Sequence, residues 1–169
     1  KIETYYEPFC GGASILMALI KSNIQVQEFI CSDINNDLIN LWNQIKDNPK
    51  SVSDHYTKLW EILNKDDDKE RKKQFFYFIR ERFNKEKNPL DFMFIMRTTT
   101  NGMPRYNKNG EFNNSFHVTR NGIIPNTLEK IIYEVISLNI PYFSFWGSSL
   151  DNITKRSKSE VNYLFNIFE

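Results

Sequence analysis

The 169-residue sequence is poor in the residues that build metal sites and disulfide scaffolds, with two cysteines and two histidines. These residues are not spaced like zinc ligands, and two cysteines give no sign of a protein made for an oxidising compartment. No apolar run approaches the length that crosses a bilayer, and the chain does not open with a signal-peptide pattern. The sequence therefore predicts a cytoplasmic protein with no metal site and no membrane contact.

An excess of charge of one sign is also lacking. Lysine and arginine together number 22 and the acidic residues 21, so the formal net charge is +1. This balance excludes a uniformly basic nucleic-acid coat but allows local basic patches. Four cations in residues 69–73 could form such a patch, although the three aspartates at 66–68 would cancel much of its field.

Apolar and aromatic side chains are plentiful, at 40% and 15% of the residues, with 14 phenylalanines. This composition is typical of a globular protein, and the length suits one core with a small inserted subdomain. Cys10 and Cys31 fall in predicted buried strand positions, where a thiol behaves as a small apolar group. We therefore expect both to belong to the core.

The most informative stretch is residues 5–14, which predict a strand, a glycine-rich turn and the start of a helix capped by Ser14. Gly11 and Gly12 lack a Cβ, so the backbone can turn sharply there and approach a ligand closely. Residues 27–33 predict a second strand that ends in Asp33. A carboxylate about twenty residues beyond the glycines is placed to accept hydrogen bonds from ribose hydroxyls.

This order of elements, a strand, a turn, a helix, a second strand and an acid, favours a ligand that contains a nucleoside. The alternative is an ordinary tight turn in an α/β domain. The turn matches neither the dinucleotide pattern G-x-G-x-x-G nor the phosphate loop G-x-x-x-x-G-K-[ST]. A compact nucleoside without a pyrophosphate is therefore the expected ligand.

Helical periodicity continues beyond this unit. It predicts helices that end near residue 48, cover 51–63, 74–83 and 90–96, and run from 126 or 127 to about 136. Residues 139–147 and 161–168 predict two further strands. His55 and His117 are expected to serve the structure rather than catalysis.

Residues 97–122 differ in character from the rest of the chain. Asn-Gly pairs at 101 and 109 favour turns, and residues 105–107 can face residues 111–113 as a short hairpin. Donors, aromatic rings and cations on a projecting element suit contacts with phosphates, base edges and unstacked bases. A polar hairpin that only covers the core is the alternative.

Together these stretches resemble the adenine-specific DNA methyltransferases that use S-adenosylmethionine, of the bacterial and phage type that recognises GATC-like sites. Residues 6–14 resemble the family's cofactor-binding motif, and residues 32–39 its second motif, whose first acid holds the cofactor ribose. The helix at 78–84 also matches. Residues 101–107 with 110–113 are similar to the family's DNA-recognition hairpin.

The resemblance implies an α/β protein with a Rossmann-like methyltransferase fold, its sheet partial or truncated, built from residues 1–50 and 125–169. Residues 51–124 would form an inserted helical and β-hairpin DNA-recognition subdomain. The implied reaction is methyl transfer from S-adenosylmethionine to N6 of an adenine flipped out of double-stranded DNA. The implied cofactor-binding residues are Glu7, Phe9, Cys10, Gly11, Gly12, Asp33, Ser149 and Asp151. Those implied to face DNA are Asn101, Met103, Arg105, Asn107 and Asn113.

Two motifs of the family are missing from the sequence. Where the catalytic tetrapeptide D-P-P-Y should follow the last predicted strand, the chain reads Asn-Ile-Phe-Glu at 166–169. The catalytic residue is therefore unknown, with Asn166 its nearest counterpart. The family's amino-terminal lysine-bearing motif, which should precede Lys1, is also absent. We expect a fragment, or a split enzyme whose remaining motifs lie on a second polypeptide.

The sequence leaves two alternatives open. The chain could be a catalytically inactive relative that acts by binding DNA or a host protein, for example as a phage or mobile-element regulator. It could also be an α/β binding domain unrelated to DNA.

Overall fold

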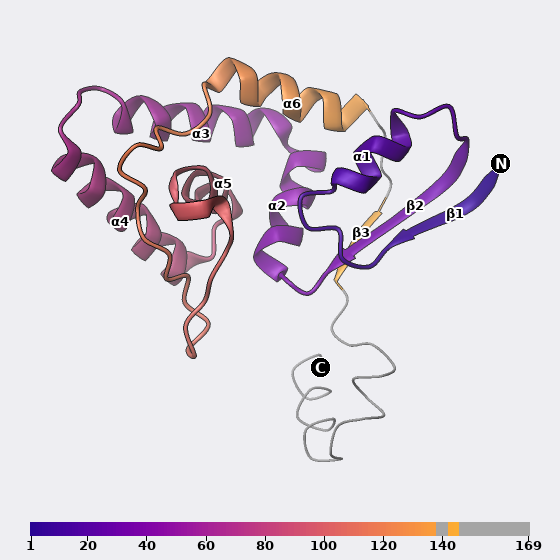
Figure 1. The fold of residues 1–169 in the computed structure, drawn as a ribbon, viewed down its shortest axis with the longest axis horizontal. Coiled ribbons are helices and arrows are strands. Elements are labelled where there is room, and N and C mark those ends of the chain that lie inside the picture. Colours follow the sequence, from indigo (N-terminus) through magenta and orange to yellow (C-terminus); the bar gives the residue numbers. More distant parts are fainter. Residues whose placement is uncertain (138–141, 146–169) are drawn as a thin grey trace, which may run out of the picture. The chain divides into compact units, whose positions relative to one another are not determined.

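The computed structural model describes residues 1–137 and 142–145 (Figure 1). The chain divides into two compact units. The first, called the sheet unit below, comprises Lys1–Ile39 and Ile140–Glu169, and the second, the helical unit, comprises Asn40–Asn139. The predicted division at residues 50 and 125 differs from this one at both boundaries.

The sheet unit contains the strands β1 (Ile2–Glu7), β2 (Val26–Asp33) and β3 (Tyr142–Phe145), with helix α1 (Ser14–Ile20) between the first two. All pairs are parallel and β2 lies in the middle. A parallel pair needs a crossover connection, and α1 is part of the one between β1 and β2. The strands predicted at the amino terminus, at 27–33 and at 139–147 are thus confirmed with slightly different bounds. The strand predicted at 161–168 lies outside the described residues.

Two local expectations in the sheet unit are wrong. Ser14 does not cap α1, because the cap is Ala13, whose φ of 56° turns the chain into the helix without a side-chain hydrogen bond. Cys10 is buried, as Cys31 is, but it does not lie in a strand, because β1 ends at Glu7. The turn therefore begins earlier than the apolar pattern indicated.

The helical unit contains α3 (Pro49–Leu63), α4 (Lys69–Glu86), α5 (Pro89–Thr98), the short 3-10 helix η1 (Thr100–Gly102) and α6 (Pro125–Ser137). Helix α2 (Asn36–Asp47) spans the boundary between the units. Three of these helices begin with proline, one or two residues earlier than predicted. Proline suits the first helical position because its missing N–H would have no partner there.

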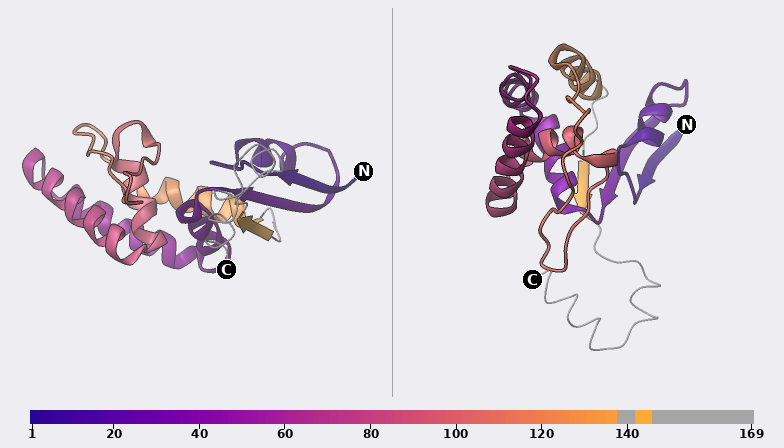
Figure 2. Two further views of the ribbon diagram at one scale, coloured as in Figure 1. Left: turned by 90° about the horizontal axis from the view of Figure 1, so that it is seen from below. Right: turned by 60° about the vertical axis from the view of Figure 1, so that its left-hand side comes forward.

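Aromatic side chains form the core of the helical unit. Tyr56, Phe76, Phe83, Phe92, Phe94 and Phe112 are among its fully buried residues. The ring of Phe83 stacks on Phe92 at 5.3 Å and meets Phe112 edge-on at 6.1 Å. Helix α3 packs against α5 and α6, and α4 against α5 (Figure 2). Helix α6 thus lies in the helical unit, packed on α3.

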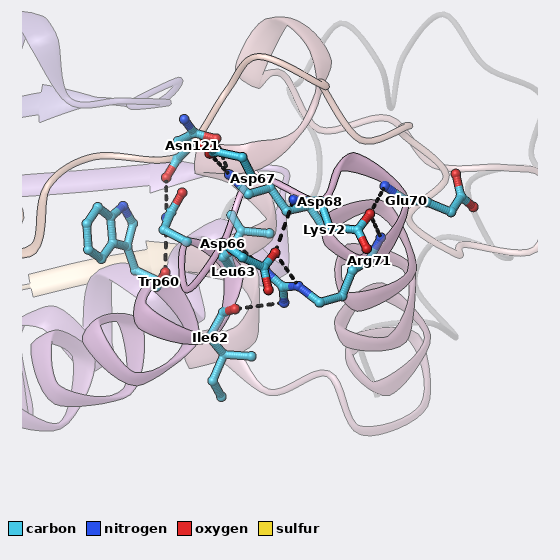
Figure 3. Close-up of polar contacts among 11 residues, drawn as sticks. Trp60, Ile62, Leu63, Asp66, Asp67, Asp68, Glu70, Arg71, Lys72 and Asn121 are labelled. Atoms are coloured by element: carbon cyan, nitrogen blue, oxygen red, sulfur yellow. Dashed lines mark hydrogen bonds and ion pairs between the residues drawn. The ribbon is translucent and has the colours of Figure 1, made fainter.

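Charged side chains of residues 66–72, before and within the start of α4, make hydrogen bonds to other groups of the helical unit (Figure 3). Asp68 caps α4 by accepting from its first free amides, at 3.0 and 3.2 Å. Arg71 donates to Asp66 at 2.8 Å and to the last carbonyls of α3. Lys72 is 5% exposed and lies 3.3 Å from the Asn121 amide oxygen. Two of the four cations considered for a basic patch, buried Lys72 and partly exposed Arg71, therefore bind groups of the protein itself.

Candidate functional site

The glycine turn lies at the carboxyl end of the parallel strands. Gly11 has a φ of +46°, which favours glycine, and a Cβ added at Gly12 would meet no atom within 4 Å. The turn is fastened to the end of β2 by two backbone donors. The Cys10 N–H donates to the Ser32 carbonyl at 2.9 Å, and the Gly11 N–H donates to Asp33 Oδ2 at 2.9 Å.

Asp33 joins the turn to the start of α2. Its Oδ1 accepts from the Asn35 N–H at 2.9 Å, while Oδ2 holds Gly11. Each carboxylate oxygen has two lone pairs, so within the described part of the chain one acceptor site on each oxygen remains beyond these bonds. The structure thus brings the glycines and Asp33, which are separated by more than twenty residues, to the same edge of the sheet.

The other predicted cofactor residues of this turn differ in their surroundings. Glu7 is 7% exposed and its carboxylate accepts from the Tyr5 hydroxyl at 3.4 Å. Burial raises the pKa of Glu7, and hydrogen bonds from Tyr5 and the Leu16 amide offset part of that rise. Phe9, in contrast, is 77% exposed. Glu7 therefore supports the turn from inside, whereas Phe9 presents its ring outward.

Both cysteines are neutral at physiological pH. Burial, with a smaller contribution from Asp33, raises the pKa of the Cys10 thiol to about 12, and burial raises that of Cys31 to about 11. A thiolate is the nucleophilic form of cysteine. These residues therefore fit the apolar role predicted for them and supply no nucleophile to the turn.

One apolar residue at this edge was missed by the sequence analysis. Ile34 directly follows Asp33 and is 69% exposed. The signal was available, because an apolar residue just beyond a strand-ending acid is no longer covered by strand neighbours. Of the remaining predictions, Ser149, Asp151 and Asn166 lie outside the described residues.

The predicted hairpin is present in the helical unit. Tyr106 pairs with Phe112, and the Asn107 N–H donates to the Glu111 carbonyl at 2.9 Å. The Gly110 N–H closes the turn onto the Asn107 carbonyl at 3.0 Å with a φ of +74°. This is the three-residue hairpin loop that ends in a left-handed glycine. Figure 1 and Figure 2 show the hairpin extending away from the helices of its unit.

Most of the residues predicted to face DNA are exposed. Asn101, Arg105 and Asn113 present their side chains outward, and Met103 is 64% exposed. Asn101 has a left-handed backbone, with a φ of 62°, which asparagine tolerates better than most residues. An exposed, backbone-constrained set of donors with an apolar side chain among them is able to contact a polar, stacked ligand.

Asn107 is different because its side chain shapes the hairpin. Its Oδ1 accepts from the N–H groups of Asn109 and Glu111 at 2.9 and 3.0 Å, and its Nδ2 donates to the Glu111 carboxylate at 2.7 Å. The side-chain oxygen and nitrogen of Asn107 are therefore both used in hydrogen bonds within the turn. A DNA contact by Asn107 stays a prediction.

Side chains of α4 that hold the hairpin were also missed. Asn84 pairs with the backbone of Phe112, accepting from its N–H at 2.8 Å and donating to its carbonyl at 3.0 Å. Arg80 donates to the Asn114 carbonyl at 3.0 Å. Their spacing of four residues, which places both on one helix face, was the only signal in the sequence.

The predicted structural histidines have such roles. His55 Nε2 lies 2.7 Å from Asp91 Oδ1, and the Arg82 guanidinium donates to both oxygens of the same carboxylate at 2.6 Å. The backbone N–H of His117 donates to the Thr98 carbonyl at 3.1 Å. Among the described residues, no group of three or more His, Cys, Asp or Glu is arranged to hold a metal ion. None of the helices in that part of the chain is long and apolar enough to cross a bilayer.

Comparison with known proteins gives a consistent result. A family model described as D12 class N6 adenine-specific DNA methyltransferase matches residues 1–153. The type II methyltransferase M.MjaIII of Methanocaldococcus jannaschii is 37% identical over 120 residues, which cover 66% of this chain and 40% of that protein. The DNA adenine methylase of Serratia marcescens is 36% identical over 115 residues, covering 65% and 38%.

A third relative matches along more of the chain. The DNA adenine methylase of Escherichia coli K12 is 29% identical over 167 residues, which cover 96% of this chain and 55% of that protein. The chain thus spans about half the length, or less, of the curated relatives that it matches.

Proposed function

The chain belongs to the D12 class N6 adenine-specific DNA methyltransferase family, and from this premise we propose that it forms part of an enzyme that methylates adenine N6 in double-stranded DNA. The sheet unit would hold S-adenosylmethionine, the methyl donor of this class, and the hairpin of the helical unit would contact the DNA.

The observation that carries this proposal is the hydrogen bond between the Gly11 N–H and the Asp33 carboxylate. It sets the glycine turn beside an acid that keeps acceptor sites for the two hydroxyls of a ribose. The open space at Gly12 permits close approach of a ligand. The exposed Phe9 ring and the exposed Ile34 side chain offer apolar contact to an adenine. The residues present therefore fit an adenosine moiety.

S-adenosylmethionine supplies an electrophilic methyl group when bound. The contribution of this chain is to bind and orient: Asp33 fixes the sugar, and the turn fixes the backbone that lies against the ligand. Orientation of two reactants supplies a large share of the rate in reactions that need little acid or base strength.

On the DNA side we propose that the hairpin reads a GATC-like site. Arg105 can donate two hydrogen bonds to the edge of a guanine, and Met103 can wedge between bases while an adenine is flipped out. The exposure of both side chains supports these roles. We assign Asn101, Asn107 and Asn113 to the same contact surface.

The proposal extends to organisation and location. We infer a Rossmann-like cofactor core, into which residues 51–124 are inserted as the recognition region; this range falls within the helical unit. We also infer a cytoplasmic location, where the DNA substrate would be accessible. The D-P-P-Y tetrapeptide is not found in residues 1–169; we propose that the catalytic group comes from elsewhere in the same protein or from a second polypeptide.

Calorimetric titration of the chain with S-adenosylmethionine tests the cofactor site. Asp33→Ala should weaken binding by about 1.5 to 3 kcal/mol, the range for hydrogen bonds to a charged group. Asp54→Ala, which removes an exposed aspartate of α3, should leave binding unchanged. A wild-type chain that does not bind, or an Asp33→Ala variant that binds as well, would contradict the proposal.

A methyl-transfer assay with a tritiated methyl group separates an active enzyme from an inactive DNA-binding relative. Transfer to adenine-containing duplex supports the proposal. If the full-length protein binds the cofactor and the duplex but transfers no methyl group, the inactive regulator is favoured instead.

A further inference from the structure

A buried amide lies beneath the segment that carries Met103 and Arg105. Asn114 is 8% exposed, and its side chain makes two short hydrogen bonds to backbone groups. Nδ2 donates to the Met103 carbonyl at 2.7 Å, and Oδ1 accepts from the Arg105 N–H at 2.7 Å. The Asn114 side chain is thus hydrogen-bonded to the backbone on both sides of Pro104.

Few backbone hydrogen bonds between described residues hold this segment. Pro104 has no N–H to give to a strand partner. On either side of it, backbone bonds fasten Thr100 to the Ser115 carbonyl and Asn113 to the Arg105 carbonyl, at 3.0 Å each. Between them, the Asn114 side chain replaces the missing strand partner. Its two bonds fix where the Met103 and Arg105 side chains leave the backbone.

Asn114 is itself fastened to helix α4. Its carbonyl accepts from Arg80 Nη1 at 3.0 Å, and the Arg80 guanidinium lies 4.5 Å from the ring centre of Tyr77. Two residues earlier, Asn84 holds the backbone of Phe112, whose ring is buried. A continuous set of contacts therefore runs from the interior of the helical unit to the exposed segment.

From this geometry we propose that Asn114 is a positioning residue for DNA sequence recognition. It touches no base itself, but it sets the direction of Arg105 and Met103 through their backbone. The proposal rests on the proposed function, because it assumes that these two side chains meet DNA. It predicts that loss of Asn114 lowers sequence preference more than it lowers affinity for DNA in general.

The first test measures amide hydrogen exchange of the free protein by NMR. In Asn114→Ala, the Arg105 amide should exchange about tenfold faster, because one hydrogen bond is lost. The Phe112 amide, held by Asn84, should keep its wild-type rate. Asn126→Ala removes the same atoms from an exposed position of α6 and should change neither rate. Unchanged exchange at Arg105 would overturn the positioning role.

The second test selects bound duplexes from a pool of random sequence. Asn114→Ala should lower the preference for the selected site by about tenfold, within the range for a guanine contact by arginine. It should lower the affinity for non-selected duplex by less than about twofold, because phosphate contacts supply that affinity. In an Arg105→Ala background, Asn114→Ala should lower the preference no further, since the two residues act through one contact.

The outcomes of the second test are distinct. Additive losses in the double variant would overturn the proposal, because Asn114 would then act independently of Arg105. A wild-type chain that selects no sequence, despite the expected change in Arg105 exchange, would contradict DNA recognition by the hairpin and with it the purpose proposed for Asn114.

A second variant serves if Asn114→Ala does not fold. Asn114→Asp has the same shape, keeps the acceptor for the Arg105 N–H, and loses the donor to the Met103 carbonyl. It should leave Arg105 exchange near the wild-type rate and still lower sequence preference. Wild-type preference in Asn114→Asp would contradict a role for the bond to Met103.

Discussion

The two units of this chain are built in different ways. The helical unit buries several large aromatic rings completely, whereas the sheet unit leaves Tyr6, Phe9, Ile15 and Ile34 between 65% and 77% exposed. Its glycine turn is held mainly by backbone donors and one carboxylate. Exposed apolar groups around a polar turn are typical of a surface that binds a ligand or another part of the protein. The hairpin, in contrast, is held by the Phe112 ring, which is buried in the aromatic core, and by the hydrogen bonds of Asn84 in α4.

Two phenylalanines test this difference most strongly. Phe112→Ala should destabilise the chain by about 3 to 5 kcal/mol, because it empties a fully buried aromatic site. Phe9→Ala, at a ring that is 77% exposed, should change stability by less than about 0.5 kcal/mol. Urea unfolding measures both. Similar losses at the two positions would contradict the contrast between the units.

The buried carboxylate of the helical unit gives the next largest effect. Asp91→Asn should cost about 2 to 4 kcal/mol, somewhat below the range for a fully buried pair because Arg82 and His55 are partly exposed. The same substitution at exposed Asp54 is the control. A thermal unfolding experiment that finds equal stability for Asp91→Asn and the wild type would show that this cluster adds nothing.

Asp91 also predicts a pH dependence. Burial alone would raise its pKa, but hydrogen bonds from His55 and Arg82 hold the pKa of Asp91 below its ordinary value. A lowered folded-state pKa stabilises above the unfolded value of about 3.9, and this stability is lost as the pH falls through the folded value. Stability of the wild type should therefore fall below about pH 4 more steeply than that of Asp91→Asn. Parallel curves would exclude this source of acid sensitivity.

Substitution of the exposed hairpin arginine should affect binding rather than stability. Arg105→Ala should weaken duplex binding by about 1 to 3 kcal/mol if the residue reads a guanine edge. Fluorescence anisotropy with several duplexes distinguishes the contacts. Equal loss on all sequences would make Arg105 a phosphate contact, and no loss would remove the hairpin from the function.

Helix capping gives the smallest contrast between the units. Asp68→Ala should destabilise α4 by about 1 kcal/mol, because the side chain holds two free amides. Ser14→Ala in α1 should cost less than about 0.5 kcal/mol, since Ser14 is not the cap. Chemical unfolding measures both variants. A larger loss at Ser14 would restore the capping role that the sequence indicated.

Helices and turns, which depend on local sequence patterns, could be predicted from the sequence. Apolar periodicity located the helices, and the Asn-Gly pair at 109 located the hairpin turn. Helix starts were missed by one or two residues at Pro49, Pro89 and Pro125 because the apolar pattern begins only after the proline.

Contacts between distant residues could not be predicted. Asn84 and Phe112 are 28 residues apart, and no local pattern pairs an asparagine side chain with a remote backbone. Lys72 and Arg71 looked like surface charges because no local pattern pairs them with the Asn121 side chain or with the last carbonyls of α3. At the glycine turn, spacing alone placed Asp33 correctly, because parallel strands end at one edge of a sheet.

The central claim is that the glycine turn and Asp33 hold the adenosine part of S-adenosylmethionine, and amide NMR spectra recorded during a titration test it most directly. We expect saturable shifts of the Gly11, Gly12 and Asn35 amide signals. These shifts should be absent in Asp33→Ala, and the Arg105 amide signal should not move. Saturable shifts confined to other residues, or none at all, would contradict it.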